Sequence, residues 1–194
     1  MAIVFFEREH LVATPWKNGG GTTREIVRMP AGSSMESFDW CTSIAEISRD
    51  GPFSTFLGVD RALVLLSGEG VQLRSPDRSI ERVLDEPLVP FEFAGESRID
   101  ASLIGGASSD FNIMTRRSTT RAEMKIVVVS QALAACSAGV LFAACGNWEV
   151  RSVDGAPRVF SLGADSGVWW SGESVAWKVE PRVASDALIA VRIE

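Results

Sequence analysis

One segment of the chain, Pro15–Ile26, brings together most of the chemical groups that could bind a small anion. The groups are an aromatic ring, an ammonium, an amide, three glycines and two hydroxyls (Trp16, Lys17, Asn18, Gly19, Gly20, Gly21, Thr22 and Thr23). Glycine has no side chain and tolerates positive φ, so its peptide N–H can approach a ligand closely. With a cation and an apolar ring beside those N–H groups, the segment predicts a site for a small carboxylate that has an apolar body.

The glycines also have a simpler interpretation, which is a wide turn leading into the alternating strand Thr23–Met29. Two features favour a binding site. The chain has only three lysines, of which one is Lys17, and a single tight turn rarely needs three glycines. The segment is not a phosphate-binding P-loop, because in a P-loop the lysine follows the glycines and a helix comes next. Here the lysine precedes the glycines and a strand follows.

Arg61 is a second candidate for the site. It follows the turn Asp50–Ser54 and stands at the start of an apolar strand, Arg61–Leu66. A guanidinium in that place could hold a carboxylate through two parallel hydrogen bonds. The alternative is a surface ion pair with Asp60 or Glu46, and the sequence leaves this open.

The elements that must position these groups are short strands. Apolar residues alternate or run continuously over short segments, which Gly, Pro, Asp and Ser interrupt. The expected strands are Ile3–Phe6, Thr23–Met29, Asp39–Ile47, Arg61–Leu66, Val71–Arg74, Ser79–Leu84, Leu88–Phe93, Ser97–Ile104 and Asp110–Arg116. No segment has an amphipathic helical pattern over three turns, and Gln131–Ala135 would form one short turn at most. Many short strands at close spacing predict an antiparallel sandwich or barrel.

An internal repeat divides the chain into two similar halves. After a shift of 77 residues without gaps, Arg74, Ser75 and Asp77 fall on Arg151, Ser152 and Asp154, and Gly95–Ser97 falls on Gly172–Ser174. The repeat predicts an all-β protein of two fused antiparallel β-barrels in one compact unit. Residues 1–118 would form the barrel with the ligand pocket, and residues 119–194 would form a structural barrel.

The same repeat predicts that only the first barrel is hollow. At the 77-residue offset the strand Asp110–Arg116 maps onto Ala187–Ile193. Successive side chains of a strand point to opposite faces, so one face of the first strand combines Asp110, Asn112, Met114 and Arg116. The matching face of the second strand is almost entirely apolar. We therefore expect the polar face to point inward, although from the strand alone it could equally be the outer face.

The composition argues against several classes of function. A net charge of −6 and a pI near 5.0 argue against a nucleic-acid partner. The longest apolar run, Ala132–Cys145, is interrupted and too short to span a membrane, and the first residues do not form a signal peptide. The three cysteines, Cys41, Cys136 and Cys145, have no metal-binding spacing. We interpret them as reduced thiols of a cytoplasmic protein.

The chain contains one histidine, His10. A Ser-His-Asp triad at any other position is therefore excluded. The multi-histidine sites of β-barrel metalloenzymes are excluded too, because one imidazole with scattered carboxylates and thiols is poor ligation for iron, copper or zinc. We expect a surface position for His10 and a site without a metal or another cofactor, and we assign no catalytic residue.

Several ordered motifs resemble the HutD/Ves family. They are Pro15–Gly21 with Thr23 and Glu25, Asp50–Ser54, Asp60–Arg61, and Asp110–Asn112 with Met114 and Arg116. The likeness covers nearly the whole chain, and the first motif is specific. The resemblance implies a bicupin, which is two fused barrels of the cupin or jelly-roll type. It also implies an accessory or regulatory component of bacterial histidine utilisation rather than a pathway enzyme.

The implied ligand is a small carboxylate of that pathway, such as urocanate, formiminoglutamate or formate, in a metal-free pocket. The Ves branch is linked only to stress induction, so the family name does not fix the ligand. One departure is Cys41, which follows Trp40 where an arginine is common in the family. A ligand contact from that arginine is therefore not implied for this chain.

The leading interpretation is a metal-free protein that binds a small carboxylate. The predicted ligand-binding residues are Trp16, Lys17, Asn18, Gly19, Gly20, Thr23, Arg61, Asp110, Asn112 and Arg116. One alternative is a metal-independent cupin enzyme, an isomerase or hydrolase that uses Lys17 or Asp110 as its acid–base group. Another is an interaction protein that binds a partner through its tryptophan-rich second half. Exposed sheet edges would also allow a homodimer.

Overall fold

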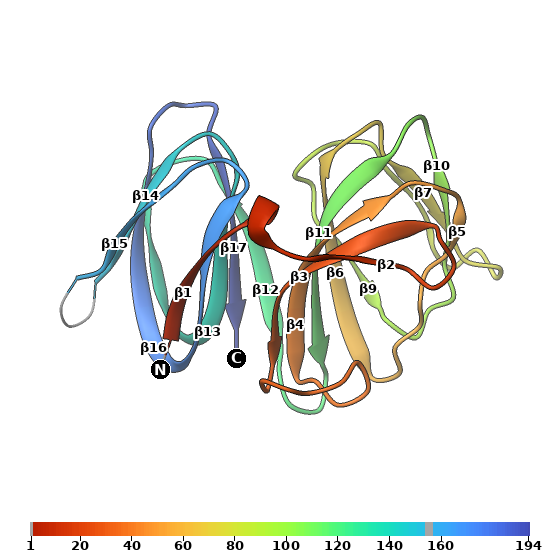
Figure 1. Cartoon of the computed structure of the whole chain (residues 1–194), viewed down its shortest axis with the longest axis horizontal. Coiled ribbons are helices and arrows are strands. Elements are labelled where there is room, and N and C mark those ends of the chain that lie inside the picture. Colours follow the sequence, from red (N-terminus) through yellow and green to blue (C-terminus); the bar gives the residue numbers. More distant parts are fainter. Residues whose placement is uncertain (1, 154–156) are drawn as a thin grey trace. The chain divides into compact units, whose positions relative to one another are not determined.

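The computed structural model describes residues 2–153 and 157–194 and shows an all-β protein (Figure 1). The chain divides into two compact units. Leu11–Arg121 forms the N-terminal unit, and Ala122–Glu194 together with the first ten residues forms the C-terminal unit. Within the described ranges the only helical element is a single 3-10 turn, η1 (Arg8–His10), and no helix there has the length and hydropathy to cross a membrane.

The N-terminal unit consists of two antiparallel sheets with the strand orders β2-β3-β4-β11-β6-β9 and β5-β10-β7-β8. The strands are β2 (Ala13–Pro15), β3 (Gly21–Met29), β4 (Trp40–Ile47), β5 (Gly51–Pro52), β6 (Val59–Ser67), β7 (Val71–Arg74), β8 (Glu81–Leu84), β9 (Phe91–Ala94), β10 (Asp100–Leu103) and β11 (Ser108–Arg116). Every strand expected in this half forms, with ends that differ by no more than three residues. The short strands β2 and β5 were not expected.

The two sheets of the N-terminal unit enclose an apolar core. Ile47 and Leu63 come from the six-stranded sheet, and Leu73 and Ala101 come from the four-stranded sheet. All four side chains are buried. Alternation along the strands places their polar neighbours on the opposite faces, so the core itself fixes which side chains point into the unit.

The C-terminal unit is one sheet with the strand order β12-β17-β13-β16-β14-β15, and β1 pairs with β16 outside this path. The strands are β1 (Ala2–Glu7), β12 (Ala122–Val127), β13 (Gln131–Cys145), β14 (Trp148–Ser152), β15 (Val159–Leu162), β16 (Ser166–Pro181) and β17 (Ala187–Ile193). Gln131–Ala135, for which the sequence allowed a short helical turn, is instead the beginning of β13.

The first strand belongs to the C-terminal unit, whereas the sequence placed residues 1–118 in the N-terminal barrel. β1 runs antiparallel to β16, with Phe6 opposite Gly167 (Figure 1). A Cβ at Gly167 would lie 2.6 Å from the ring of Phe6, so the glycine makes room for the ring. Phe6 also stacks on Phe142 of β13 at 6.1 Å between ring centroids. A partner so distant in sequence leaves no signal in local periodicity.

The sequence repeat corresponds to a repeat of topology. β11 lies between β4 and β6, as β17 lies between β12 and β13. β7 pairs with β8, as β14 pairs with β15. One matched position, Asp154, lies outside the described residues. Within the described part of the chain, the two halves therefore share an arrangement of strands as well as a few identical residues.

The strand pairings align the two halves one residue away from the alignment that the sequence repeat gives. Asn112 lies opposite Leu63, and Ala190 lies opposite Leu141. Both leucines belong to the buried core of their unit, so Asn112 corresponds to Ala190 and not to Ile189, as the 77-residue offset gives. A slip of one residue moves a side chain to the other face. With this shift Asp110 and Asn112 correspond to Leu188 and Ala190, which pack in the apolar core. Met114 and Arg116 correspond to Arg192 and Glu194, so the matching face is apolar only in its first half.

The ladders also show what replaces Arg61 in the C-terminal unit. Arg61 lies opposite Met114, and Gly139 lies opposite Arg192, so Gly139 takes the place of Arg61. A Cβ at Gly139 would lie 2.6 Å from the indole of Trp170. The Trp170 ring therefore lies where the other unit has its arginine side chain, and it packs in the core with Trp148 and Trp177.

Gly139→Ala is expected to destabilise the protein, because the new methyl group meets both the Trp170 ring and the carbonyl oxygen of Val191. Overpacking of this kind costs about 1–3 kcal/mol. Urea unfolding followed by tryptophan fluorescence measures the loss. Gly106→Ala is the matched control, since a Cβ there meets nothing within 4 Å. Equal stability of the two variants would contradict the role given to Gly139.

Candidate functional site

A cavity of about 570 Å³ opens in the N-terminal unit. Its walls come from β3, β4, β6 and β11, from the loop before β3 and from the segment after β5. A volume of this size is typical of sites for small molecules. The cavity brings together seven of the predicted ligand-binding residues: Trp16, Lys17, Asn18, Thr23, Arg61, Asp110 and Asn112. It is not lined by Gly19, Gly20 or Arg116.

Aromatic rings enclose the guanidinium of Arg61. Its central carbon lies 5.3 Å from the ring centroid of Phe53, 5.7 Å from that of Phe56 and 5.0 Å from that of Phe93. Cations are attracted to the faces of aromatic rings, and more strongly where water is excluded. The rings therefore hold the cation in place on its apolar sides.

Two weak hydrogen bonds orient the same guanidinium. Nη2 of Arg61 donates to Oδ1 of Asn112 at 3.3 Å, and Nη1 donates to the carbonyl oxygen of Ser54 at 3.4 Å. Nε is buried and has no hydrogen-bond partner among the described residues. The surface ion pair with Asp60 or Glu46 does not form, because Asp60 pairs with Arg117 instead and no ion pair of Arg61 occurs within the described part of the chain.

Burial lowers the pKa of Arg61 to about 10, while the negative charge of Asp110 acts in the opposite direction. The side chain therefore remains a cation at neutral pH. A cation without a carboxylate partner, in a cavity large enough for a small molecule, can bind an anion there.

Asp110 lines the cavity beside Arg61 and is 7% exposed. Its Oδ1 atom has no hydrogen-bond partner among the described residues, and no ion pair joins it to Arg61 in that part of the chain. Burial raises the pKa of Asp110 to about 7, and the positive charge of Arg61 opposes this rise. Near neutral pH the group is therefore divided between its neutral and its ionised forms.

Trp16 and Thr23 form another part of the wall. The indole Nε1 of Trp16 donates to Oγ1 of Thr23 at 2.7 Å, and the indole meets the ring of Phe53 edge to face at 6.5 Å. Since the hydrogen bond satisfies the polar atom of the indole, its carbon surface is left to face the cavity as an apolar wall.

The glycines of the loop serve the backbone and not a ligand. The N–H of Gly19, whose φ is 69°, donates to the carbonyl oxygen of Trp16 at 3.0 Å. The N–H of Gly20 donates to Oδ1 of Asn18 at 3.0 Å. A Cβ at Gly21 would lie 2.1 Å from the carbonyl oxygen of Glu46, so only glycine fits there. The prediction that Gly19 and Gly20 contribute free N–H groups is therefore not met in this structure.

Arg116 lies at the end of β11 and binds the backbone. Its Nε donates to the carbonyl oxygen of Phe38 and its Nη2 to that of Glu36, both at 2.8 Å. The guanidinium also lies over the ring of Phe38 at 5.4 Å. Alternation along the strand placed Arg116 on the same face as Asp110, but its side chain caps a neighbouring loop instead of reaching the cavity.

Several lining residues were missed by sequence reasoning, among them Phe53, Phe56 and Glu25 as parts of the wall. The phenyl rings follow the Asp50–Ser54 turn, but only the fold shows that they surround Arg61. Cys41 also lines the cavity, and burial raises the pKa of its thiol to about 12. The thiol is therefore neutral at physiological pH and adds no charge to the site.

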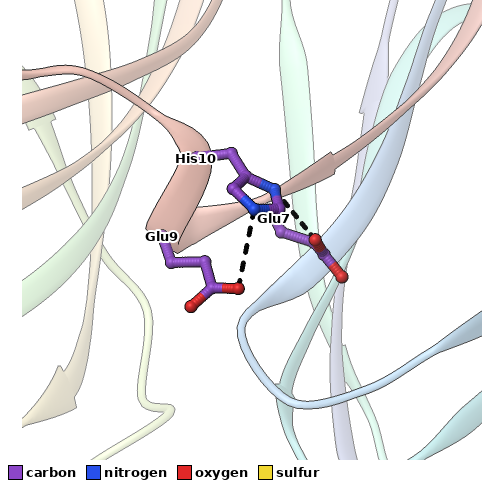
Figure 2. Close-up of side chains that lie close together, drawn as sticks. All are labelled: Glu7, Glu9 and His10. Atoms are coloured by element: carbon purple, nitrogen blue, oxygen red, sulfur yellow. Dashed lines mark ion pairs between the residues drawn. The ribbon is translucent and has the colours of Figure 1, made fainter.

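The cavity does not offer a metal-binding set. Its walls contain no histidine, and its acidic and thiol side chains do not converge. Within the described residues, the one group of three candidate ligands is Glu7, Glu9 and His10 in the C-terminal unit (Figure 2). Nδ1 of His10 lies 2.9 Å from Glu7, and Nε2 lies 3.7 Å from Glu9. The histidine is 70% exposed, as expected from the sequence, and the group is a surface ion-pair cluster.

The protein has a cupin fold. A cupin 2 conserved barrel domain protein from Leptotrichia buccalis aligns over 100% of this chain and 98% of its own, with a TM-score of 0.62 and 10% identity. The HutD family model matches residues 8–189. The chain belongs to the HutD family.

Relatives support the assignment along much of the chain. An uncharacterized 21.2 kDa protein in the hutC 3' region of Pseudomonas putida is 39% identical over 140 residues, 70% of each chain. Protein Ves of Escherichia fergusonii is 36% identical over 147 residues, 75% of each. The structure of HutD from Pseudomonas fluorescens SBW25, from a formate condition, has a TM-score of 0.83 and 29% identity over 99% of this chain and 98% of its own. The resemblance seen in the sequence motifs is confirmed.

Asp110→Asn is expected to change the dependence of stability on pH. The folded-state pKa of Asp110, about 7, lies above the ordinary value of 3.8. Its contribution to the free energy of unfolding is therefore fully present below pH 4 and is lost as the pH rises to 7. The variant lacks this loss, so relative to wild type it gains up to about 4 kcal/mol between pH 4 and pH 8. Urea unfolding at the two pH values measures the gain.

Asp100→Asn is the control for that comparison, because Asp100 is exposed and lies outside the cavity. The gain of Asp110→Asn between the two pH values should exceed that of Asp100→Asn. A stability difference between Asp110→Asn and wild type that is the same at both pH values would show that Asp110 has an ordinary pKa.

Proposed function

We propose that the protein binds a small carboxylate in the cavity of the N-terminal unit and serves as an accessory or regulatory component of histidine utilisation. The observation that carries the proposal is the guanidinium of Arg61, which lines a cavity of about 570 Å³ without a carboxylate partner among the described residues. Aromatic rings and an amide already hold this cation, so a ligand carboxylate would meet a preorganised group.

The family assignment supports the choice of ligands. One relative lies in the hutC 3' region of Pseudomonas putida, and the HutD structure from Pseudomonas fluorescens SBW25 comes from a formate condition. Urocanate, formiminoglutamate and formate are therefore the candidates. A water molecule takes up about 30 Å³ of liquid volume, so the cavity has room for a molecule much larger than formate.

The lining residues suggest how such a ligand would lie. Its carboxylate would bind Arg61, and its body would pack on the indole of Trp16 and the ring of Phe53, which already touch edge to face. Asn112 accepts a hydrogen bond from Arg61 through Oδ1, so its NH₂ group remains for an acceptor on the ligand. Lys17 lies at the exposed side of the cavity and would add positive charge at its entrance.

A thermal-shift assay with urocanate, formiminoglutamate, histidine, glutamate and formate tests the site. A ligand at a hundredfold excess over Kd stabilises the folded protein by about 2.7 kcal/mol, so we expect a clear rise in Tm with at least one carboxylate. Arg61→Ala should abolish the rise, and Arg61→Lys should weaken it, because lysine lacks the planar fork of donors.

Arg49→Ala is the matched control, since Arg49 is exposed and does not line the cavity. It should keep the full thermal shift. No shift with any of the five compounds, or an undiminished shift in Arg61→Ala, would contradict the proposed site.

The second candidate function is a metal-independent isomerase or hydrolase. One observation favours it: burial raises the pKa of Asp110 to about 7, and an acid–base catalyst works best when its pKa lies near the operating pH. If the protein is such an enzyme, it should convert urocanate or formiminoglutamate, and Asp110→Asn should lose at least a hundredfold in kcat. Product formation followed by chromatography decides this, and binding without turnover excludes it for those compounds.

A further inference from the structure

The buried part of the cavity has one positive and one negative side chain that are not joined to each other. Asp110 is 7% exposed, and its Oδ1 atom has no partner among the described residues. Arg61 lines the same cavity, and within the described part of the chain no ion pair connects the two side chains. A buried carboxylate without a close partner is expensive to keep ionised, and this cost must be met when the site is used.

The other titratable groups around Asp110 do not change this balance. From β4, Cys41 is neutral, because burial raises the pKa of its thiol to about 12. From β3, Glu25 lies 3.0 Å from Arg28 and is 42% exposed. From the loop before β3, Lys17 is exposed. In the buried part of the cavity, the charge of Arg61 on β6 therefore faces only the charge of Asp110 on β11.

A ligand carboxylate at Arg61 would be a second anion beside a single cation. Two carboxylates that share a site with little water cannot easily both remain ionised, and the pKa of one of them rises. A proton on Asp110 would restore the balance of one anion to one cation. It would also turn the side chain into a hydrogen-bond donor, which a ligand oxygen could accept.

We propose that Asp110 takes up a proton when a carboxylate binds beside Arg61, so that ligand binding in this cavity is coupled to protonation of the protein. The inference rests on the proposed function, because it concerns the same site. With this coupling, the affinity for anionic ligands is higher at low pH, where Asp110 is protonated, than at high pH. A ligand that placed a cationic nitrogen against Asp110 would show the opposite dependence on pH.

The free site is already close to its protonated form near neutral pH, because the pKa of Asp110 is about 7. Uptake of the proton therefore costs little at pH 7 and progressively more above it. With one proton bound per ligand, Kd should rise about tenfold for each pH unit above 7 and should level off below pH 6.

Isothermal calorimetry with the full chain and formate as the probe tests the coupling between pH 6 and pH 9, where formate stays ionised. We expect Kd to rise about tenfold per unit above pH 7. In two buffers of different ionisation enthalpy, the protein should take up close to one proton per formate at pH 8.5 and much less at pH 6. In Asp110→Asn the dependence of Kd on pH should flatten, whereas the control Asp100→Asn should keep it.

Each other result overturns part of the proposal in a different way. Binding of formate to wild type with the same Kd at every pH would overturn the coupling and leave the carboxylate site intact. A slope that survives in Asp110→Asn would overturn the assignment to Asp110, and a Kd that falls as the pH rises would overturn its sign. Formate that binds at no pH would overturn the coupling for formate, and the carboxylate site would fall with it if the other four compounds also gave no thermal shift. If Asp110→Asn does not fold, the proton uptake of wild type decides.

Discussion

The contact on which the site depends is the enclosure of the Arg61 guanidinium by the rings of Phe53, Phe56 and Phe93. A half-buried cation is normally balanced by a carboxylate, but here quadrupolar rings and the Asn112 amide take that place. The cation is thus fixed in position while its charge stays available. A direct ion pair would have neutralised that charge within the protein, and the cavity would then not attract an anion.

The two units use one arrangement of strands for different purposes. In the C-terminal unit, Gly139 at the place of Arg61 lets the Trp170 indole enter, and the tryptophan core closes around it. In the N-terminal unit, the arginine side chain cannot be covered in this way without burying its charge, so the interior remains open at that point. The C-terminal unit still has a smaller pocket, of about 240 Å³, beside Trp170 and Trp177. The exchange of Arg61 for Gly139 therefore accounts for a difference in size between two cavities.

In the loop before β3, the backbone supports the site and the side chains line the cavity. Its glycines allow a compact turn, in which the N–H of Gly20 binds Asn18 and the carbonyl oxygen of Gly20 binds the backbone of Ser48 and Arg49. The turn holds Trp16 where its Nε1 reaches Thr23 and its ring reaches the cavity. The loop therefore contributes side chains to the cavity, and the backbone groups that drew attention to it hold those side chains in place.

Alternation and turn residues by themselves determined the strands, because these depend on neighbours within a few residues, and the 77-residue repeat indicated the duplication. The strand alone left open whether the face with Asp110 and Asn112 points inward. Only the tertiary structure decided that Ala2–Glu7 joins the C-terminal unit, that Arg116 caps a loop, and that phenyl rings surround Arg61. These outcomes depend on partners far apart in sequence and on a ladder register in which one residue exchanges the two faces. The raised pKa of Asp110 has the same origin, since burial is a property of the packed fold and not of the strand.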